Sequence, residues 1–330
     1  MRGVTAVVLL VVWAGAARVV SGTRYAFYRS MVDKSERGGE GEYTRRVFGG
    51  EAAELATFPA ACALMDRYWR ARCSAAVVAP RWALTAAHCV TPRIAYIKYN
   101  MRRPIGSDGK YVAVHYLYRH PDFKVVNEDE GRGMDVTLLH HDVGLVRTRE
   151  DMVLESRPAT DPLVALRLYN PVDLKNEEVE VLGFGRTERS SMGEELFSVK
   201  LQLVFCDRGS WFHCVCGVAT GRDRRGVCSG DSGGPVLYRG VQVGVTSMGP
   251  VECSQENSSD AGVEPGTGAT SVFTALYNYA DLVNDTIYDT EEALRMQRIV
   301  GSAEKAATAS TAHLATLTLV PLLLTILPAR

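Results

Sequence analysis

The sequence lacks an excess of charge of either sign. Its 37 Lys and Arg residues are balanced by 38 Asp and Glu residues, for a formal net charge of −1 over 330 residues. Proteins that bind nucleic acid usually carry a basic patch that neutralises phosphate groups. Composition gives no indication of such a patch, and we expect no nucleic-acid partner.

Long apolar runs are also lacking, since the runs near both ends fall short of the roughly 20 residues that a transmembrane helix needs. The first run, Val4 to Ala17, follows Arg2 and ends in small residues. This order is typical of a secretory signal peptide, which we assign to residues 1–22. We therefore expect the protein to be secreted or held on the extracellular face of the cell membrane.

The second apolar run, Leu314 to Pro328, follows a polar spacer, Glu304 to His313, and a group of small residues, Gly301 to Ala303. This order is typical of a glycosylphosphatidylinositol (GPI) attachment signal. We assign residues 301–330 to the spacer and signal, with lipid joined near Gly301 or Ser302. Ala309-Ser310-Thr311 is an alternative attachment site. A short protein anchor or an unprocessed tail is the alternative to a lipid.

Three separated segments carry residues suited to nucleophilic catalysis. Trp82 to Cys89 contains His88, Asp142 opens an apolar run, and Gly230-Asp231-Ser232-Gly233-Gly234-Pro235 holds a serine in a glycine-rich turn. Each motif alone is common, but the three together resemble the chymotrypsin/trypsin family of serine endopeptidases. The order His, Asp, Ser is that of chymotrypsin and differs from the order in subtilisins and α/β-hydrolases.

The resemblance assigns each of these residues a role. A serine hydroxyl is a weak nucleophile at neutral pH, so Ser232 needs a base within reach, and this base would be His88. Asp142 would fix the tautomer of the imidazole and stabilise its protonated form. The backbone N–H groups of Gly230 and Ser232 would form the oxyanion hole.

Asp135 is a rival for the role of Asp142, because it also opens an apolar run. The run after Asp142 continues into Leu145 to Thr148, whereas that after Asp135 leads into the polar pair His140-His141. We therefore favour Asp142. On this assignment the acidic stretch from Asn127 to Gly133 is expected to form a surface loop before the strand.

A cleavage site is suggested by Val47-Phe48-Gly49-Gly50, which resembles the Ile-Val-Gly-Gly start of mature enzymes in this family. The resemblance implies a zymogen, in which cleavage after Arg46 frees an ammonium on Val47 that pairs with Asp231. We assign residues 23–46 to an activation propeptide and residues 47–300 to the protease domain. The propeptide has no cysteine, so it should hold no clip domain and no disulfide tether.

The eight cysteines fit an oxidising compartment. The family resemblance pairs Cys73 with Cys89 and Cys228 with Cys253. We favour Cys206 with Cys216 as a third pair, and leave open whether Cys62 pairs with Cys214.

Metal ligands are not evident in the sequence. The segment Cys214-Val215-Cys216 could contribute to a metal site, but only the isolated His213 lies beside it and no histidine cluster with zinc spacing completes it. We expect no bound metal ion and no cofactor.

Short apolar runs between turn residues predict strands, as at Ala75 to Val78, Val179 to Leu182 and Val241 to Val245. The family resemblance implies an all-β fold of two antiparallel six-stranded β-barrels with a C-terminal helix. His88 and Asp142 would lie on the first barrel and Ser232 on the second.

The residues expected to line the primary specificity pocket carry no charge. The family resemblance places Gly226 at the floor position, six residues before Ser232, where trypsin-like members have an aspartate. The expected walls are Val227, Gly249 with the preceding Ser247, and Ser271. These residues favour large uncharged side chains, in the manner of chymotrypsin first and elastase second. Asp260 or Glu264, in an insertion after Cys253, could instead restore a preference for basic residues.

The sequence as a whole predicts a serine endopeptidase that acts on proteins or peptides. Its expected partners are its substrates, an activating protease and protein inhibitors. A catalytically silent binding protein on the same scaffold is one alternative. An α/β-hydrolase esterase is a second, which the order of the motifs disfavours. Asn257 and Asn284 lie in N-glycosylation sequences, as expected for a secreted glycoprotein.

Overall fold

The structure is a computed structural model that describes residues 50–103, 106–129, 134–185, 195–206, 210–220, 226–228, 230–249, 270–288 and 296–299. All of these belong to one compact unit. The predicted signal peptide, propeptide, cleavage site and C-terminal tail lie outside the described residues, as do Cys253, Asp260 and Glu264. Within the described ranges, no helix is long and apolar enough to cross a membrane.

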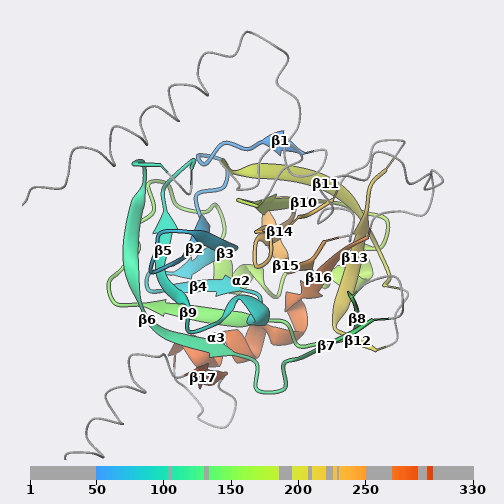
Figure 1. Ribbon diagram of the computed structural model, residues 1–330. Helices are drawn as coiled ribbons and strands as arrows, with labels where there is room; N and C mark the ends of the chain where they lie inside the picture. The colour runs from blue at the N-terminus through green and yellow to red at the C-terminus, as the bar shows by residue number, and fades with distance from the viewer. Residues whose placement is uncertain are drawn as a thin grey trace, which may run out of the picture. The chain divides into compact units, whose positions relative to one another are not determined.

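The first of two barrels lies on the left of Figure 1. Its six antiparallel strands follow the order β6-β5-β2-β3-β4-β9, and β9 pairs back onto β6 to close the barrel. A short strand, β17 (Gln297–Ile299), adds to the outer side of β6. The barrel strands are β2 (Ala61–Asp66), β3 (Ala71–Ala79), β4 (Trp82–Thr85), β5 (Ile94–Tyr99), β6 (Lys110–Arg119) and β9 (Gly144–Thr148).

The second barrel lies on the right of Figure 1 and closes in the same way. Its order is β11-β10-β14-β15-β16-β13, with β13 paired back onto β11, and β1 (Glu51–Ala52) adds to the edge of β11. The prediction of two six-stranded antiparallel barrels is thus confirmed. The strands are β10 (Glu178–Gly183), β11 (Phe197–Val204), β13 (Cys214–Val218), β14 (Pro235–Tyr238), β15 (Val241–Met248) and β16 (Ser271–Ala275).

Strand β2 explains how the two barrels are held together. All six of its residues are buried. Because successive side chains of a strand point to opposite faces, Cys62 and Leu64 enter the core of the first barrel. Ala61, Ala63 and Met65 face the other way, into an apolar cluster that also contains Leu182, Phe184 and Leu196 next to and within the second barrel. Burial of each large apolar side chain contributes about 1.5 to 3 kcal/mol.

A third, smaller sheet corrects one expectation. Strands β7 (Lys124–Asp129) and β8 (Met134–His140) form an antiparallel hairpin, and β12 (Trp211–Phe212) pairs with β8 in parallel. The expected loop from Asn127 to Gly133 was therefore wrong for Asn127–Asp129, which end β7. Their polarity suggested a loop, but pairing with the following strand satisfies their backbone groups, and local propensity is a weak guide to strands.

The helices among the described residues are short. The C-terminal helix α3 (Ala280–Tyr288) follows the 3₁₀ turn η4 (Leu276–Tyr279), and its Ala280 and Val283 pack into the core of the first barrel. Asn284, in one of the two expected glycosylation sequences, is half-buried in α3, and Asn257 lies outside the described residues. The other short helices are η1 (Ala87–Cys89), α2 (Pro162–Ala165) and η2 (Pro171–Leu174).

Candidate active site

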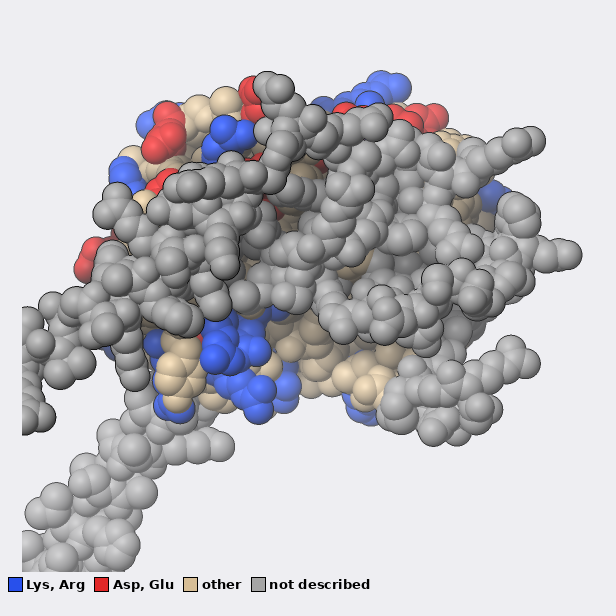
Figure 2. Space-filling model, turned by 45° about the horizontal axis from the view of Figure 1, so that its top comes forward, with Lys and Arg blue, Asp and Glu red and all other residues tan. Residues whose placement is uncertain are grey.

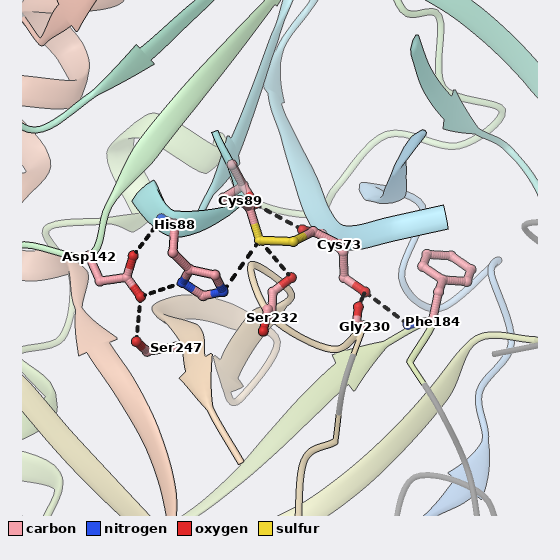
Figure 3. Close-up of a disulfide and its surroundings, with 10 residues drawn as sticks. Cys73, His88, Cys89, Asp142, Phe184, Gly230, Ser232 and Ser247 are labelled. Atoms are coloured by element: carbon pink, nitrogen blue, oxygen red, sulfur yellow. Dashed lines mark hydrogen bonds and ion pairs between the residues drawn. A yellow bond between two sulfur atoms is a disulfide. The ribbon is translucent and has the colours of Figure 1, made fainter. Parts of the chain in front are cut away.

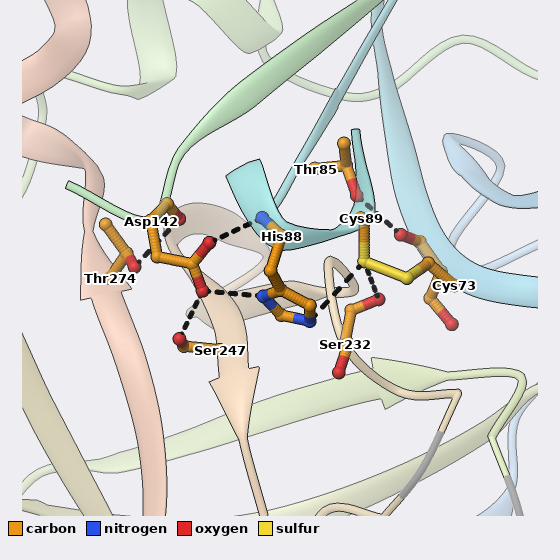
Figure 4. Close-up of polar contacts among 9 residues, drawn as sticks. Cys73, Thr85, His88, Cys89, Asp142, Ser232, Ser247 and Thr274 are labelled. Carbon is orange, nitrogen blue, oxygen red and sulfur yellow. Dashed lines mark hydrogen bonds and ion pairs between the residues drawn. A yellow bond between two sulfur atoms is a disulfide. The ribbon is translucent and has the colours of Figure 1, made fainter. Parts of the chain in front are cut away.

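His88 and Asp142 are joined by two hydrogen bonds. His88 lies in η1, just after β4, and its Nδ1 is 2.8 Å from Oδ2 of Asp142. The backbone N–H of His88 donates to the other carboxylate oxygen at 2.9 Å. Because a carboxylate can only accept, Nδ1 carries the proton and Nε2 keeps a lone pair. Figure 4 shows that Nε2 lies on the side of the ring nearer Ser232.

Asp142 is held in place by the second barrel. Its side chain is 0 % exposed. The hydroxyl of Ser247, on β15, donates to Oδ2, and that of Thr274, on β16, donates to the backbone carbonyl at 3.0 Å. Ser247 was expected to line the substrate pocket, and Thr274 was not singled out by its sequence. Only the packing of β15 and β16 against the first barrel brings both hydroxyls to this aspartate.

Asp142 and His88 each stabilise the charged form of the other. Burial opposes ionisation of Asp142, but attraction to His88 and the hydrogen bonds from His88 and Ser247 hold its pKa below the usual value. Burial also opposes protonation of His88, but the Asp142 carboxylate outweighs it and raises the pKa of His88. The arrangement therefore keeps the carboxylate ionised and makes the imidazole more basic.

The two candidate aspartates, Asp135 and Asp142, lie at opposite ends of β8. Asp135 lies near the start of β8 and is paired with Glu128 across the hairpin. Asp142 lies beyond the other end of β8, and its carboxylate is the one that contacts His88.

Ser232 lies in the loop between β13 and β14, in a turn that requires glycine. Gly230 and Gly233 have φ values of +97° and +83°, a region that side-chain-bearing residues rarely adopt. A Cβ added at Gly233 would lie 2.0 Å from Oγ1 of Thr85 on the first barrel. The Gly233 N–H donates to the Thr246 carbonyl at 2.7 Å. The loop is therefore tied to both barrels.

Ser74 ties the loop that carries Ser232 to the first barrel, and the sequence did not single it out. Its hydroxyl donates to the Gly230 carbonyl at 2.8 Å and accepts from the Phe184 N–H at 2.9 Å (Figure 3). Its own N–H donates to the Ser232 carbonyl at 2.8 Å. These bonds fix the backbone that carries the expected oxyanion donors. The available signal was a single hydroxyl within the apolar stretch from Cys73 to Val78.

The contact between Ser232 and His88 is open in this structure. Although both residues are described, Oγ of Ser232 makes no hydrogen bond with Nε2 of His88. Nε2 instead lies 3.7 Å from Sγ of Cys89, which is also 3.5 Å from the Ser232 carbonyl. A disulfide sulfur has no proton to donate, so these are packing contacts. In active sites without substrate, hydrogen bonds of this kind are often long and tighten on binding.

Asp231, beside Ser232, is a buried carboxyl group. It accepts the N–H of Gly185 and the N–H of Cys228, each at 2.8 Å. Burial raises its pKa to about 7, and these two hydrogen bonds only partly oppose the shift. Among the residues the structure describes, no basic side chain forms an ion pair with it. The group is thus placed to accept a cation.

The residues expected to line the specificity pocket lie together, but without space between two of them. The Ser271 hydroxyl accepts the Val227 N–H at 3.1 Å, and Gly226, Ser247 and Ser271 are buried. A Cβ added at Gly249 would lie only 1.9 Å from the Val227 carbonyl oxygen. The two expected walls therefore touch, and no substrate side chain could enter between them in this state.

A separate pocket of about 900 Å³ lies on the first barrel and contains none of His88, Asp142 or Ser232. Its lining includes several basic side chains of the first barrel. Figure 2 shows Lys and Arg side chains gathered on one part of the visible face, with charges of both signs elsewhere. The basic lining residues of the pocket are Arg67, Arg72, Arg93, His115 and Arg149.

Two disulfides are complete within the described residues. Cys73 bonds to Cys89, with Cα atoms 6.1 Å apart, and Cys206 bonds to Cys216, with Cα atoms 5.0 Å apart. Both pairings match the expectation. Cys228 is also disulfide-bonded, and its expected partner Cys253 lies outside the described residues. Cys62 and Cys214 are free thiols, so they do not form a fourth bond with each other.

The chain is similar to known proteolytic enzymes. The family model for trypsin matches residues 47–275. Human kallikrein-2 is 26% identical over 271 residues, covering 73% of this chain and 90% of its own length. The CLIP domain-containing serine protease B4 of Anopheles gambiae is 24% identical, covering 75% and 72%. The trypsin of Simulium vittatum is 27% identical, covering 64% and 85%.

Proposed function

Because the chain belongs to the trypsin family of serine endopeptidases, we propose that it cleaves peptide bonds through an acyl-enzyme on Ser232. The observation that carries this is the 2.8 Å contact between His88 and Asp142, which leaves Nε2 of His88 unprotonated on the side of Ser232. Nε2 takes the hydroxyl proton as Oγ attacks the substrate carbonyl carbon. The protonated imidazole then gives this proton to the leaving amine.

The second half of the reaction repeats these steps with water. His88 deprotonates the water, which attacks the acyl-enzyme carbonyl, and the protonated imidazole gives this proton to Oγ of Ser232 as the acyl–oxygen bond breaks. In both halves the N–H groups of Gly230 and Ser232 stabilise the oxyanion, and loss of one such donor typically costs about 100- to 1,000-fold in rate.

A fluorophosphonate probe tests this function directly, because it reacts only with an activated serine. After cleavage at Arg46 the wild-type protein should be labelled, and a Ser232→Ala variant should not. The same material should hydrolyse peptides only when Ser232 is present. A correctly folded, cleaved protein that takes up no label would favour the alternative of a catalytically silent binding protein.

Activation follows from the buried carboxyl group of Asp231. We propose that cleavage after Arg46 frees the ammonium of Val47 and that this group pairs with Asp231. The pairing is supported by the burial of Asp231 and by the absence of a cationic partner among the described residues, since buried charges are stable only when paired.

Specificity follows from the uncharged residues around Gly226. The activated enzyme should prefer large uncharged side chains before the cleaved bond, as chymotrypsin does, with elastase-like cleavage as the second choice. Without an acid at the floor, a buried Arg or Lys would lose its hydration without gaining a partner. We propose that the contact between Gly249 and Val227 opens on activation. Asp260 or Glu264 reaching the pocket would produce the alternative, a basic preference.

The location follows from the two ends of the chain. We propose that the signal peptide directs export and that a lipid near Gly301 or Ser302 replaces the C-terminal tail. The mature enzyme would then act on proteins or peptides at the outer cell surface, where an activating protease and protein inhibitors can reach it.

A further inference from the structure

Four of the seven histidines of the chain gather beside Asp142. His120 follows β6, His140 ends β8, His141 directly precedes Asp142, and His213 lies between β12 and β13. The ring of His141 is the centre of the group, with centroid distances of 4.1 Å to His120, 6.1 Å to His140 and 6.0 Å to His213. Segments far apart in the sequence therefore supply one cluster.

Three side chains of this region have the spacing of metal ligands. One atom each from His120, Asp122 and His141 lies within 4.8 Å of the other two. Zinc binds histidine nitrogen and carboxylate oxygen at about 2.0 to 2.2 Å, so tetrahedral ligand atoms lie about 3.3 to 3.6 Å apart. Rotation of these side chains would bring the three atoms around one ion, with water in the fourth position.

His141 already has the hydrogen bond that orients a histidine ligand. Its Nδ1 lies 2.9 Å from the phenolic oxygen of Tyr279, which is itself buried. When Nδ1–H donates this hydrogen bond to the Tyr279 oxygen, Nε2 has a free lone pair. Metal-bound histidines usually have such a hydrogen-bond partner on the nitrogen that does not bind the metal. Burial first, and repulsion from neighbouring histidines second, lower the pKa values of His120 and His141, which keeps both rings neutral.

Binding an ion requires two local changes. The rings of His120 and His141 are stacked at an interplanar angle of 6°, so they must turn before their lone pairs converge. Nδ1 of His120 also accepts the Asp122 N–H at 3.1 Å, and the proton must move from Nε2 to Nδ1. Asp122 is exposed and both rings are partly exposed. The ion can therefore arrive from solvent, and water can replace the lost hydrogen bond.

We propose that His120, Asp122 and His141 bind a divalent cation of the zinc type, and that this ion inhibits peptide hydrolysis. The inhibition rests on the proposed function, since it acts through Asp142. The His120 N–H donates to the Val143 carbonyl at 3.1 Å, and the Val143 N–H donates to the His141 carbonyl at 2.8 Å. Both ligand segments are thus bonded to the residues on either side of Asp142, and moving them displaces its carboxylate from His88.

The first experiment measures binding without hydrolysis. Full-length protein carrying Ser232→Ala is stripped of metal and titrated with Zn²⁺ against a chromophoric chelator, and with Co²⁺ while its visible absorption is followed. We expect one ion per chain, with affinity lower by at least about tenfold in His120→Asn and in His141→Asn. His115→Asn, outside the cluster, is the matched control and should bind as the parent does.

Asparagine is chosen because it should preserve the fold at both positions. At 120 its side chain can accept the N–H two residues on, as the histidine does. At 141 the backbone φ is +54°, which asparagine tolerates better than most residues. Thermal unfolding of each variant checks that the fold is retained.

The second experiment measures peptide hydrolysis by the cleaved protein with an intact Ser232. Zn²⁺ should lower kcat, a chelator should restore it, and His120→Asn should resist the inhibition. Absence of binding by the Ser232→Ala protein, or equal binding by all three asparagine variants, would overturn the site. Binding with unchanged kcat, or inhibition that persists in His120→Asn, would overturn the inhibition. Binding by a protein that never hydrolyses peptides would support the site while refuting the proposed function.

Discussion

Asp142 can remain ionised while fully buried because three hydrogen bonds reach its carboxylate, two from His88 and one from Ser247. A buried charge without such partners would lose several kcal/mol of solvation. The same bonds hold the imidazole in the orientation and tautomer that a general base requires. This single side chain therefore connects the packing of both barrels to the chemistry proposed for Ser232.

Replacement of Asp142 tests that connection. Asp142→Asn should lower kcat by about 10,000-fold, because the amide can donate a hydrogen bond to His88 and so favours the wrong tautomer. Asp135→Asn, made at the rival position on β8, should remain nearly normal. Both values come from hydrolysis of a peptide substrate by cleaved protein. A severe loss in Asp135→Asn with little loss in Asp142→Asn would reverse the assignment.

The pH dependence of hydrolysis tests the charge state of His88. The Asp142 carboxylate raises the pKa of His88 above 6.5, and only neutral His88 can accept the Ser232 proton. Hydrolysis should therefore fall as pH drops, with the midpoint of kcat/KM above 6.5. In Asp142→Asn the remaining activity should have its midpoint at lower pH, because the attraction is gone. An unchanged midpoint would mean that another group controls the profile.

The pair formed by His88 and Asp142 also makes the free energy of unfolding depend on pH. The contribution from His88 is present below pH 6.5 and is lost as pH rises through its raised folded pKa. The contribution from Asp142 is present above pH 3.8 and is lost as pH falls through its lowered folded pKa. The pair therefore stabilises the fold most between these limits.

At the scale of structural elements, two loops are expected to change when the propeptide is cleaved. The loop before β14 holds Asp231 and Ser232, and the end of β15 leads to Gly249, which touches Val227. While this contact is closed, no large side chain can enter at that point. Ordering of both loops by one new ion pair would link cleavage of the propeptide to substrate access.

The uncut precursor should be inactive. Arg46→Gln should block cleavage and keep peptide hydrolysis at background, because the Val47 ammonium never forms and Asp231 remains without a cationic partner. N-terminal sequencing of active wild-type material should start at Val47. Full activity from intact Arg46→Gln protein would refute the activation mechanism.

Cleavage of a peptide library tests the pocket. The activated enzyme should cut after large uncharged residues and poorly after Arg or Lys, because Gly226 offers no charge to a desolvated cation. Gly226→Asp should shift the preference only partly toward basic residues, since the surrounding loops also contribute. Predominant cleavage after Arg by the wild-type enzyme would instead indicate an acid from the insertion, Asp260 or Glu264.

At the scale of the whole molecule, the site residues of each barrel are held in place by hydrogen bonds from the other barrel. Asp142, from the first barrel, is held by Ser247 and Thr274 of the second. The Ser232 loop, from the second barrel, is held by Ser74 of the first. The arrangement therefore depends on the apolar cluster between the barrels, and loosening that cluster would disturb both halves together.

The position of the molecule in the cell is a further prediction at this scale. Phosphatidylinositol-specific phospholipase should release active protease from intact cells, and truncation at Gly301 should give freely secreted protein. A protein that resists the lipase while an antibody still detects residues 314–328 on mature material would have a protein anchor instead.

The sequence by itself determined the chemistry and the architecture to be expected. The segments around His88 and Ser232 form tight turns, and the turn at Ser232 requires glycine at Gly230 and Gly233. Such local requirements appear as motifs in the sequence. Short apolar runs at β3, β10 and β15 likewise predicted strands, because strand periodicity is a local property. The cysteine pairs Cys73–Cys89 and Cys206–Cys216 were also correctly expected.

Only the tertiary structure decided which groups meet. It brings the carboxylate of Asp142 to His88, pairs Asn127–Asp129 in a hairpin, and closes Gly249 onto Val227. It also places His213, isolated in the sequence, beside His141, which stacks on the His120 that follows β6. Contacts between distant segments depend on strand register, barrel closure and side-chain packing, and no periodicity along the chain records them.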